Sequence, residues 1–218
     1  MISILNLFDS VCHALPNYKS GVNPMPEFNS KVNEAQKELM DAIAVKYDQN
    51  ERIRTLLDPF VLNATGTAVG SIVKPTGFYR ALGITLTHAT KTIPVYQAKE
   101  NELIAQDYLP QRKANLDNGI AYYKQAGTTI TVIPSTSAPY SMFYLRSPLD
   151  AALSSVYTAL PSGELALTAS GVIDLEWDES AYNLLLNRVL RKYGVTGKDE
   201  LVLQASSADI NSDLIAEP

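Results

Sequence analysis

The spacing of apolar residues changes twice along this chain, and that change constrains the fold more than any other feature. Up to about residue 60, apolar residues recur at steps of three and four, which is typical of helices that pack by one face. Threonine, valine, tyrosine and glycine then become frequent, and short alternating stretches replace the helical spacing as far as residue 177. Helical spacing returns in the next stretch of the chain.

These changes predict an α+β fold in which a β-rich segment is inserted into a helical unit. Residues 1–60 form the N-terminal helical part, and residues 61–177 form a central antiparallel β-rich insertion. Residues 178–218 supply a C-terminal helix and an acidic tail, which we expect to pack with the N-terminal helices.

Residues 26–47 contain the clearest predicted helix. Pro24 and Pro26 fix the backbone before the first turn, and Glu27 places negative charge near the helix N-terminus, where it is favoured. The polar face mixes lysine with glutamate and aspartate, so it indicates a solvated face and not a nucleic-acid-binding surface. The predicted apolar face consists of Phe28, Val32, Ala35, Leu39, Ala42, Ile43 and Tyr47.

Shorter helices are predicted at 2–15 and 182–193. The stretch 47–60 either prolongs the long helix or starts a new one. Its helix must end by Asp58, because Pro59 biases the preceding residue away from helical geometry.

Alternating stretches predict short strands within the insertion. The clearest are "GITLTH" and "TTITVIP", in which isoleucine, leucine and valine alternate with threonine. Further strands are predicted at 141–148, 163–170 and 172–177. The polar stretch 97–119 is expected to be a long loop or a short helix between strands.

Composition narrows the functional classes. The 218 residues carry a net charge of -5 and a pI near 5.1, which argues against a general phosphate-binding surface. A single cysteine, Cys12, excludes an internal disulfide framework and fits assembly in a reducing cytoplasm. The N-terminus lacks the basic region of a signal peptide, and no apolar run approaches the roughly 18 residues of a membrane span. A soluble protein without a membrane partner is therefore expected.

No arrangement of residues typical of catalysis is found. His13 and His88 belong to no motif, and "GVTGKDE" has two residues between its first glycine and Gly-Lys where a phosphate loop needs four. Asp174 and Glu176 alternate with apolar residues, as on the polar side of a half-buried strand, so a hydrolase site there is the minor alternative. The sequence predicts no catalytic residue, no cofactor and no bound metal.

Five segments, in this order, resemble a family of virion structural proteins of crAss-like and related Bacteroidetes phages, whose members include head–tail connector ring proteins. Residues 62–140 match that family less well. The matching segments are "PEFNSKVNEAQKEL" at 26–39, "YDQNERIRTLLDPF" at 47–60, "SMFYLRSP" at 141–148, "IDLEW" at 173–177 and "LLLNRVLRKYGV" at 184–195.

The resemblance implies a structural role without catalysis. It implies a ring of about twelve identical subunits beneath the portal, in which each subunit uses two different complementary surfaces. The implied partners are the portal and other neck or tail proteins, with DNA passing through the ring without specific binding. Such a protein is assembled in the bacterial host cytoplasm and becomes part of the virion neck or tail. The alternatives are another tail or capsid accessory protein and a small acidic-site hydrolase.

Polar and aromatic residues within the matching segments are the candidates for contacts between subunits. Capping, turn formation and internal salt bridges are the alternative roles for each of them. The candidates are Asn29, Asn33, Gln36, Arg52, Arg54, Asp58, Tyr144 and Arg146.

Overall fold

The computed structural model describes residues 1–15, 25–98, 113–159 and 165–194, and, within strands, the backbone alone for residues 155–170. The chain divides into two compact units. One, here called the helical unit, is formed by residues 1–59 and 148–218, and the other, the sheet unit, by residues 60–147. The predicted α+β class, with helices on both sides of a β-rich region in the sequence, is confirmed.

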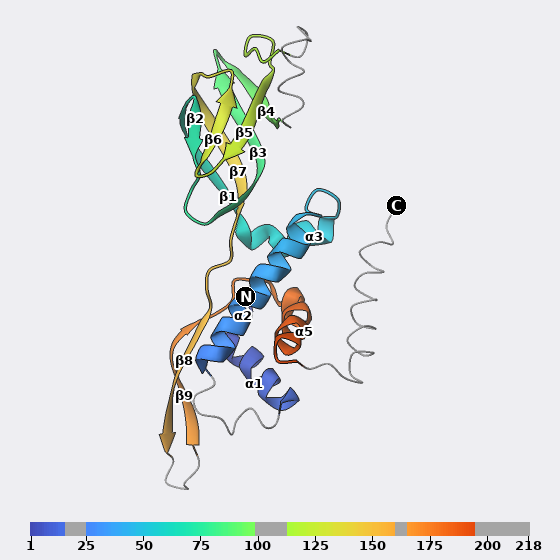
Figure 1. Ribbon diagram of the computed structural model, residues 1–218, viewed down its shortest axis with the longest axis vertical. Helices are drawn as coiled ribbons and strands as arrows, with labels where there is room; N and C mark the ends of the chain where they lie inside the picture. Colours follow the sequence, from blue (N-terminus) through green and yellow to red (C-terminus); the bar gives the residue numbers. More distant parts are fainter. Residues whose placement is uncertain (16–24, 99–112, 160–164, 195–218) are drawn as a thin grey trace. The chain divides into compact units, whose positions relative to one another are not determined.

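The helical unit is built around α2 (Met25–Ala44). The C-terminal helix α5 (Tyr182–Lys192) packs against α2 and against α1 (Ile4–Ala14), as Figure 1 shows. The rings of Phe8 and Phe28 join α1 to α2 edge to face, with centroids 5.1 Å apart.

The apolar face of α2 differs from the predicted one at its C-terminal end. Ala42 is exposed, and Tyr47 follows the end of the helix at Ala44, whereas Met40 is buried. A step of 100° per residue turns position 42 toward water when positions 39, 40 and 43 face the core. Gln36 is also fully buried, although its side chain is polar.

The stretch 47–60 starts a new helix, α3 (Glu51–Leu57), followed by a single 3-10 turn, η2 (Asp58–Phe60). The Asn50 side chain caps α3 by accepting hydrogen bonds from the backbone N–H groups of Arg52 and Ile53, at 2.9 and 3.4 Å. The predicted stop at Asp58 lies one residue beyond the last residue of α3.

The sheet unit contains a seven-stranded sheet in the order β1-β7-β3-β4-β5-β6-β2. All neighbouring pairs are antiparallel except β4 and β5. The strands are β1 (Val61–Val69), β2 (Ser71–Val73), β3 (Phe78–His88), β4 (Lys91–Gln97), β5 (Ala121–Ala126), β6 (Thr129–Ile133) and β7 (Ser137–Arg146).

Gly70 closes this sheet. It is the one residue between β1 and β2, which are the first and last strands in the sheet order, so a single stretch of chain joins both ends (Figure 1). Its N–H donates to the carbonyl of Thr136, and its carbonyl accepts from the N–H of Val132. The enclosed core includes Ile72, Ile84, Leu86, Ile93, Val95, Tyr123, Ile130, Val132, Met142 and Tyr144.

The strands beyond residue 147 belong to the helical unit and not to the sheet unit. β8 (Ala152–Ala159) and β9 (Leu165–Ile173) form a separate two-stranded antiparallel sheet. The sequence placed the end of the insertion at residue 177 because alternation continues that far. Alternation of apolar and polar residues indicates a strand, but it does not indicate the sheet to which the strand belongs.

The predicted strand at 172–177 is wrong in its extent. β9 ends at Ile173, which is 52% exposed, whereas Leu175 and Trp177 are fully buried, so the three do not share one environment. Leu175 forms an isolated antiparallel bridge with Ile2. No helix within the described ranges has the length and apolar character needed to cross a membrane.

Replacing Gly70 by alanine is expected to destabilise the sheet unit by about 1–3 kcal/mol, because a residue with a side chain is strained at positive φ. Gly70 has φ of 70°, and an added Cβ would lie 2.7 Å from Oγ of Ser135. Urea unfolding of the variant measures the loss. Gly83→Ala is the control, because Gly83 has no positive φ and nothing within 4 Å of such a Cβ. Equal stabilities of the two variants would contradict this role of Gly70.

Candidate functional site: an amide ladder on helix α2

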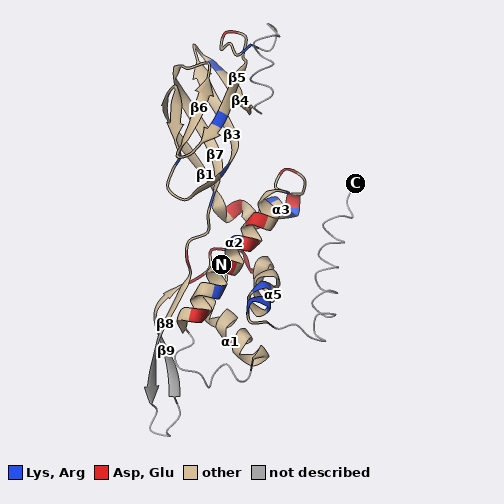
Figure 2. Cartoon of the chain, viewed as in Figure 1, with Lys and Arg blue, Asp and Glu red and all other residues tan. Residues whose placement is uncertain are grey.

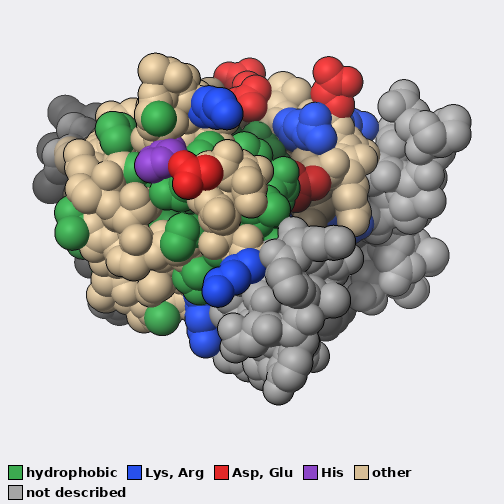
Figure 3. Space-filling model, turned by 90° about the horizontal axis from the view of Figure 1, so that it is seen from above, with side chains coloured by type: hydrophobic (Ala, Val, Ile, Leu, Met, Phe, Trp, Pro, Cys, Tyr) green, Lys and Arg blue, Asp and Glu red, His purple; other side chains and the backbone are tan. Residues whose placement is uncertain are grey.

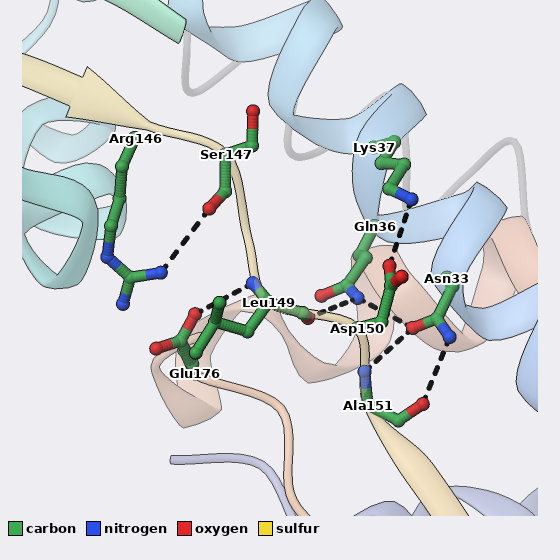
Figure 4. Close-up of polar contacts among 9 residues, drawn as sticks. All are labelled: Asn33, Gln36, Lys37, Arg146, Ser147, Leu149, Asp150, Ala151 and Glu176. Atoms are coloured by element: carbon green, nitrogen blue, oxygen red, sulfur yellow. Dashed lines mark hydrogen bonds and ion pairs between the residues drawn. The ribbon is translucent and has the colours of Figure 1, made fainter. Parts of the chain in front are cut away.

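Three side-chain amides on one stripe of α2 bind the extended segment 149–153, and we call this set the amide ladder. Oδ1 of Asn29 accepts from the N–H of Leu153 at 2.9 Å, and Nδ2 donates to the carbonyl of the same residue at 3.2 Å. Asn33 binds Ala151 in the same way, at 2.8 and 3.0 Å (Figure 4). Each asparagine therefore reproduces the donor and acceptor pair of a neighbouring strand.

Gln36 is the third member of the amide ladder. Its Nε2 donates to the carbonyl of Leu149 at 2.9 Å and to Oδ1 of Asn33 at 2.8 Å. The N–H of Leu149 donates instead to Oε2 of Glu176 at 3.0 Å (Figure 4). The carbonyl of Leu149 is thus bound by Gln36 of α2, and its N–H by Glu176 in the stretch after β9.

The periods of the two elements explain why the amide ladder fits. Four residues of α-helix rise about 6 Å, and two residues of a strand about 6.6 Å, so amides four apart on α2 meet every second residue of the segment. The last step, from Asn33 to Gln36, is one residue shorter, and the longer glutamine side chain makes up the difference. Asn-x3-Asn-x2-Gln beside an apolar stripe is the sequence signal that could have predicted this arrangement.

The eight predicted contact residues are distributed over both compact units. Asn29, Asn33 and Gln36 belong to the amide ladder, and Arg52, Arg54 and Asp58 lie in or directly after α3. Tyr144 and Arg146 lie on β7 in the other compact unit. Their role between subunits stays a prediction.

Several of these residues have contacts that explain them within the chain. Arg54 donates to the carbonyls of Tyr47 and Asp48 at 3.1 and 3.0 Å, which fixes the connection before α3. Tyr144 is buried and stacks on Phe78, with ring centroids 5.7 Å apart.

The charges of Arg146 and Asp58 also act on aromatic side chains of the same chain. The guanidinium of Arg146 lies over the ring of Phe60 at 5.8 Å. Burial raises the pKa of the Tyr47 hydroxyl, and the negative charge of Asp58 raises it further. Arg52 is exposed at the start of α3.

The acidic pair that the sequence left open as a hydrolase site is engaged by backbone groups. Oδ1 of Asp174 accepts from the N–H of Ile4 at 3.0 Å, at the N-terminus of α1, where a carboxylate is favoured. Glu176 accepts from Leu149, as described above. Asp178 accepts from the N–H and hydroxyl of Ser180, and these bonds lower its pKa. Each carboxylate therefore has a structural task.

The other candidates for chemistry lie apart. His13 is exposed near the end of α1, and Cys12 is buried. Nε2 of His88 lies 3.4 Å from Oδ1 of Asp117 in the sheet unit. Over the described residues, no group of three or more His, Cys, Asp or Glu side chains is placed to hold a metal ion. Of "GVTGKDE", only Gly194 lies within the described residues.

A charged contact between α2 and α5 was not predicted from the sequence. Nζ of Lys192 pairs with Glu34 at 2.7 Å and with Glu38, and Figure 2 shows acidic positions along α2 and basic positions on α5. Nζ of Lys31 donates to the carbonyl of Lys192 at 2.7 Å and lies 4.8 Å from the ring centre of Tyr193. The spacing of Glu34 and Glu38 by one helical turn was the signal for a shared cation.

Comparison with known proteins adds no relationship: no protein-family description matches the chain, and no curated protein is similar to it in sequence.

Asn33→Ala is expected to destabilise the helical unit by about 2–3 kcal/mol, because the backbone N–H and carbonyl of Ala151 lose their partners in a partly buried site. Urea unfolding gives this difference. Lys37→Ala is the matched control, since Lys37 lies on the same helix and pairs with Asp150 at 2.9 Å in an exposed contact. That change should cost about 0–1 kcal/mol. Equal losses would show that the amide ladder adds nothing beyond surface contacts.

The Lys192 contact should make stability depend on pH at both extremes. The hydrogen bond from Lys192 and its positive charge lower the pKa of Glu34. The stability that Glu34 contributes is therefore full above its ordinary pKa of 4.5 and is lost as pH falls through the lowered pKa. The pKa of Lys192 is raised, so its contribution is full below 10.5 and is lost as pH rises through the raised pKa.

Thermal unfolding across acidic and alkaline pH measures both losses. In Lys192→Met the dependence should be weaker at each extreme, whereas Arg191→Met, an exposed neighbour, should keep the wild-type profile. The effect is small, because both carboxylates are about half exposed to solvent. Identical profiles for the two variants would remove this explanation.

Proposed function

We propose that this chain is a structural subunit of a bacteriophage virion, a head–tail connector ring protein that assembles as a cyclic oligomer beneath the portal. The observation that carries the proposal is the division of charge between the two compact units. Residues 60–147 contain eight Lys and Arg but four Asp and Glu, whereas the rest of the chain contains ten and nineteen. One subunit therefore offers a basic and an acidic body.

Opposite charges on two bodies suit head-to-tail assembly. A cyclic ring needs two different, complementary surfaces on every subunit, and complementary charge fixes partner and orientation.

Exposed apolar side chains on the sheet unit give a second reason to expect protein contacts. Tyr96 and Phe143 are 56% and 51% exposed, and Val69 and Val73 are more exposed still. Figure 3 shows hydrophobic side chains at the surface, with a few charged side chains between them. Aromatic side chains exposed in this way are common anchors of protein interfaces.

The acidic excess of the helical unit fits a conduit for DNA, because fixed contacts to phosphate would hold the duplex. In this proposal DNA passes without specific binding, and a ring with a strongly basic inner wall would eliminate it. Another tail or capsid accessory role uses the same two bodies and differs in location within the virion. A hydrolase at Asp174 and Glu176 is less favoured, since both carboxylates hold backbone N–H groups.

Native mass spectrometry should find a cyclic oligomer of about twelve copies, either alone or once the portal of the same phage is added. Because the proposed contact joins opposite charges, rising salt should dissociate it. Electron microscopy of the virion should place the chain at the neck. The proposal is lost if the chain stays monomeric with the portal present, or if it turns over a substrate and Asp174→Asn abolishes turnover with the fold intact.

A further inference from the structure

Strand β1 lies at one end of the seven-stranded sheet and pairs along its whole length, Val61–Val69, with one neighbour, β7. The strand after Gly70, β2, pairs with β6, so no strand of the described chain other than β7 pairs with β1. A strand with one neighbour has an unpaired row of N–H and carbonyl groups, to which a further strand can add. We call this row on β1 the β1 edge.

One hydrogen bond shows which residues of β1 face this edge. Continued by one residue beyond the pair of Val69 and Ser137, the register of β1 and β7 places Gly70 opposite Thr136, and the Gly70 N–H donates to the Thr136 carbonyl at 2.9 Å. Antiparallel strands alternate between opposite residues that exchange hydrogen bonds and opposite residues that do not. Even-numbered residues of β1 therefore bond to β7, and odd-numbered residues direct their backbone groups to the β1 edge.

The other side of β7 agrees with this assignment. Ser141 lies opposite Thr65 of β1 and also opposite Thr85 of β3. The Thr85 hydroxyl donates to the Ser141 carbonyl at 3.4 Å, so this carbonyl points toward β3 and away from Thr65. The central residues of the β1 edge are thus Asn63, Thr65 and Thr67, and all three are exposed.

Nothing in the sequence of β1 opposes pairing with another strand. Natural edge strands are commonly protected by charged side chains, by proline or by being very short. The nine residues of β1 read VLNATGTAV, which contains no charged residue and no proline, and they form a longer strand than the average of about 5–6 residues. The β1 edge is therefore suited to the addition of a strand.

The order of residues in β1 makes a second copy of β1 a matching partner. In an antiparallel pair centred on Thr65, this residue lies opposite itself, Asn63 lies opposite Thr67, and Val61 lies opposite Val69. Pairs of β-branched or hydroxyl-bearing side chains stabilise antiparallel strands, and no like charges meet in this register. A strand of unrelated sequence would have this complementarity by chance, whereas a second copy always has it.

We propose that two copies of the chain pair through the β1 edge, antiparallel and with Thr65 beside the two-fold axis. The backbone groups of Asn63, Thr65 and Thr67 then bind those of Thr67, Thr65 and Asn63 in the second copy. The two seven-stranded sheets become continuous across this contact.

This pairing goes beyond the proposed ring and does not rest on it. A two-fold contact is isologous, whereas neighbours in a cyclic ring meet through two different surfaces. Pairing through the β1 edge is therefore a property of chains outside the ring. It covers an edge that would otherwise be available to unrelated strands.

Sedimentation equilibrium of the full chain without the portal should show a monomer–dimer equilibrium. Thr65→Lys places two ammonium groups against each other at the centre of the contact, so the dissociation constant should rise roughly tenfold or more. Thr65→Glu should have the same effect. An equimolar mixture of the two variants brings opposite charges together and should restore the dimer.

Thr87→Lys is the matched control. Thr87 is an exposed threonine on β3, which has a neighbouring strand on each side, so the added charge does not lie on a strand edge. This variant should dimerise as the wild type does.

Hydrogen exchange locates the contact within β1. The amides of Asn63, Thr65 and Thr67 should exchange more slowly as the protein concentration rises, because they gain partners only in the dimer. The amides of Ala64 and Gly66 bond to β7 in the monomer as well, so their exchange should not depend on concentration.

Three results would overturn the proposal. They are a wild-type chain that shows no dimer at any concentration, a Thr65→Lys variant that dimerises as the wild type does, and a Lys and Glu mixture that stays monomeric. None of these results bears on the ring, which native mass spectrometry with the portal present tests separately.

Discussion

The helical unit depends on the fit between a helix and an extended chain. Asn29, Asn33 and Gln36 hold segment 149–153 through its backbone groups, so the contact is largely independent of the side chains of that segment. This is the point at which the chain re-enters the helical unit after the sheet unit. A buried extended segment needs partners for its N–H and carbonyl groups, and α2 supplies them from its polar flank. The apolar stripe of the same helix packs with α5, and Phe28 on this stripe contacts Phe8 of α1.

Several carboxylates that could suggest catalysis accept hydrogen bonds from backbone N–H groups instead. Asp174 binds the first residue of α1 and Glu176 binds Leu149, so both fasten segments that are distant in sequence to the stretch after β9. Leu175 between them bridges to Ile2. The alternation in "VIDLEW" therefore reflects a single extended stretch whose polar residues point at backbone donors. This arrangement agrees with the structural role that we propose.

Much of the architecture follows from periodicity. The long helix from Met25, the restart capped by Asn50 and the final helix ending at Lys192 all have local signals in spacing, capping and proline placement. The strands at "GITLTH" and "TTITVIP" follow in the same way. The amide ladder was harder to predict from the sequence. The eight residues chosen as subunit contacts included all three members of the amide ladder, because their polarity exceeded what a solvated helix needs. Their partner, segment 149–153, lies more than a hundred residues away along the chain, so no local sequence pattern identifies it.

The sequence by itself determined where the helices lie, several of the strands and most of the apolar face of α2, because these depend on neighbours within one or two turns. Only the tertiary structure decided that the sheet closes through Gly70 and that β8 and β9 belong with the helices. It also decided that Lys192 pairs with α2. These features depend on which distant backbone groups and charges meet in space, and a period of two or of 3.6 residues carries no information about that.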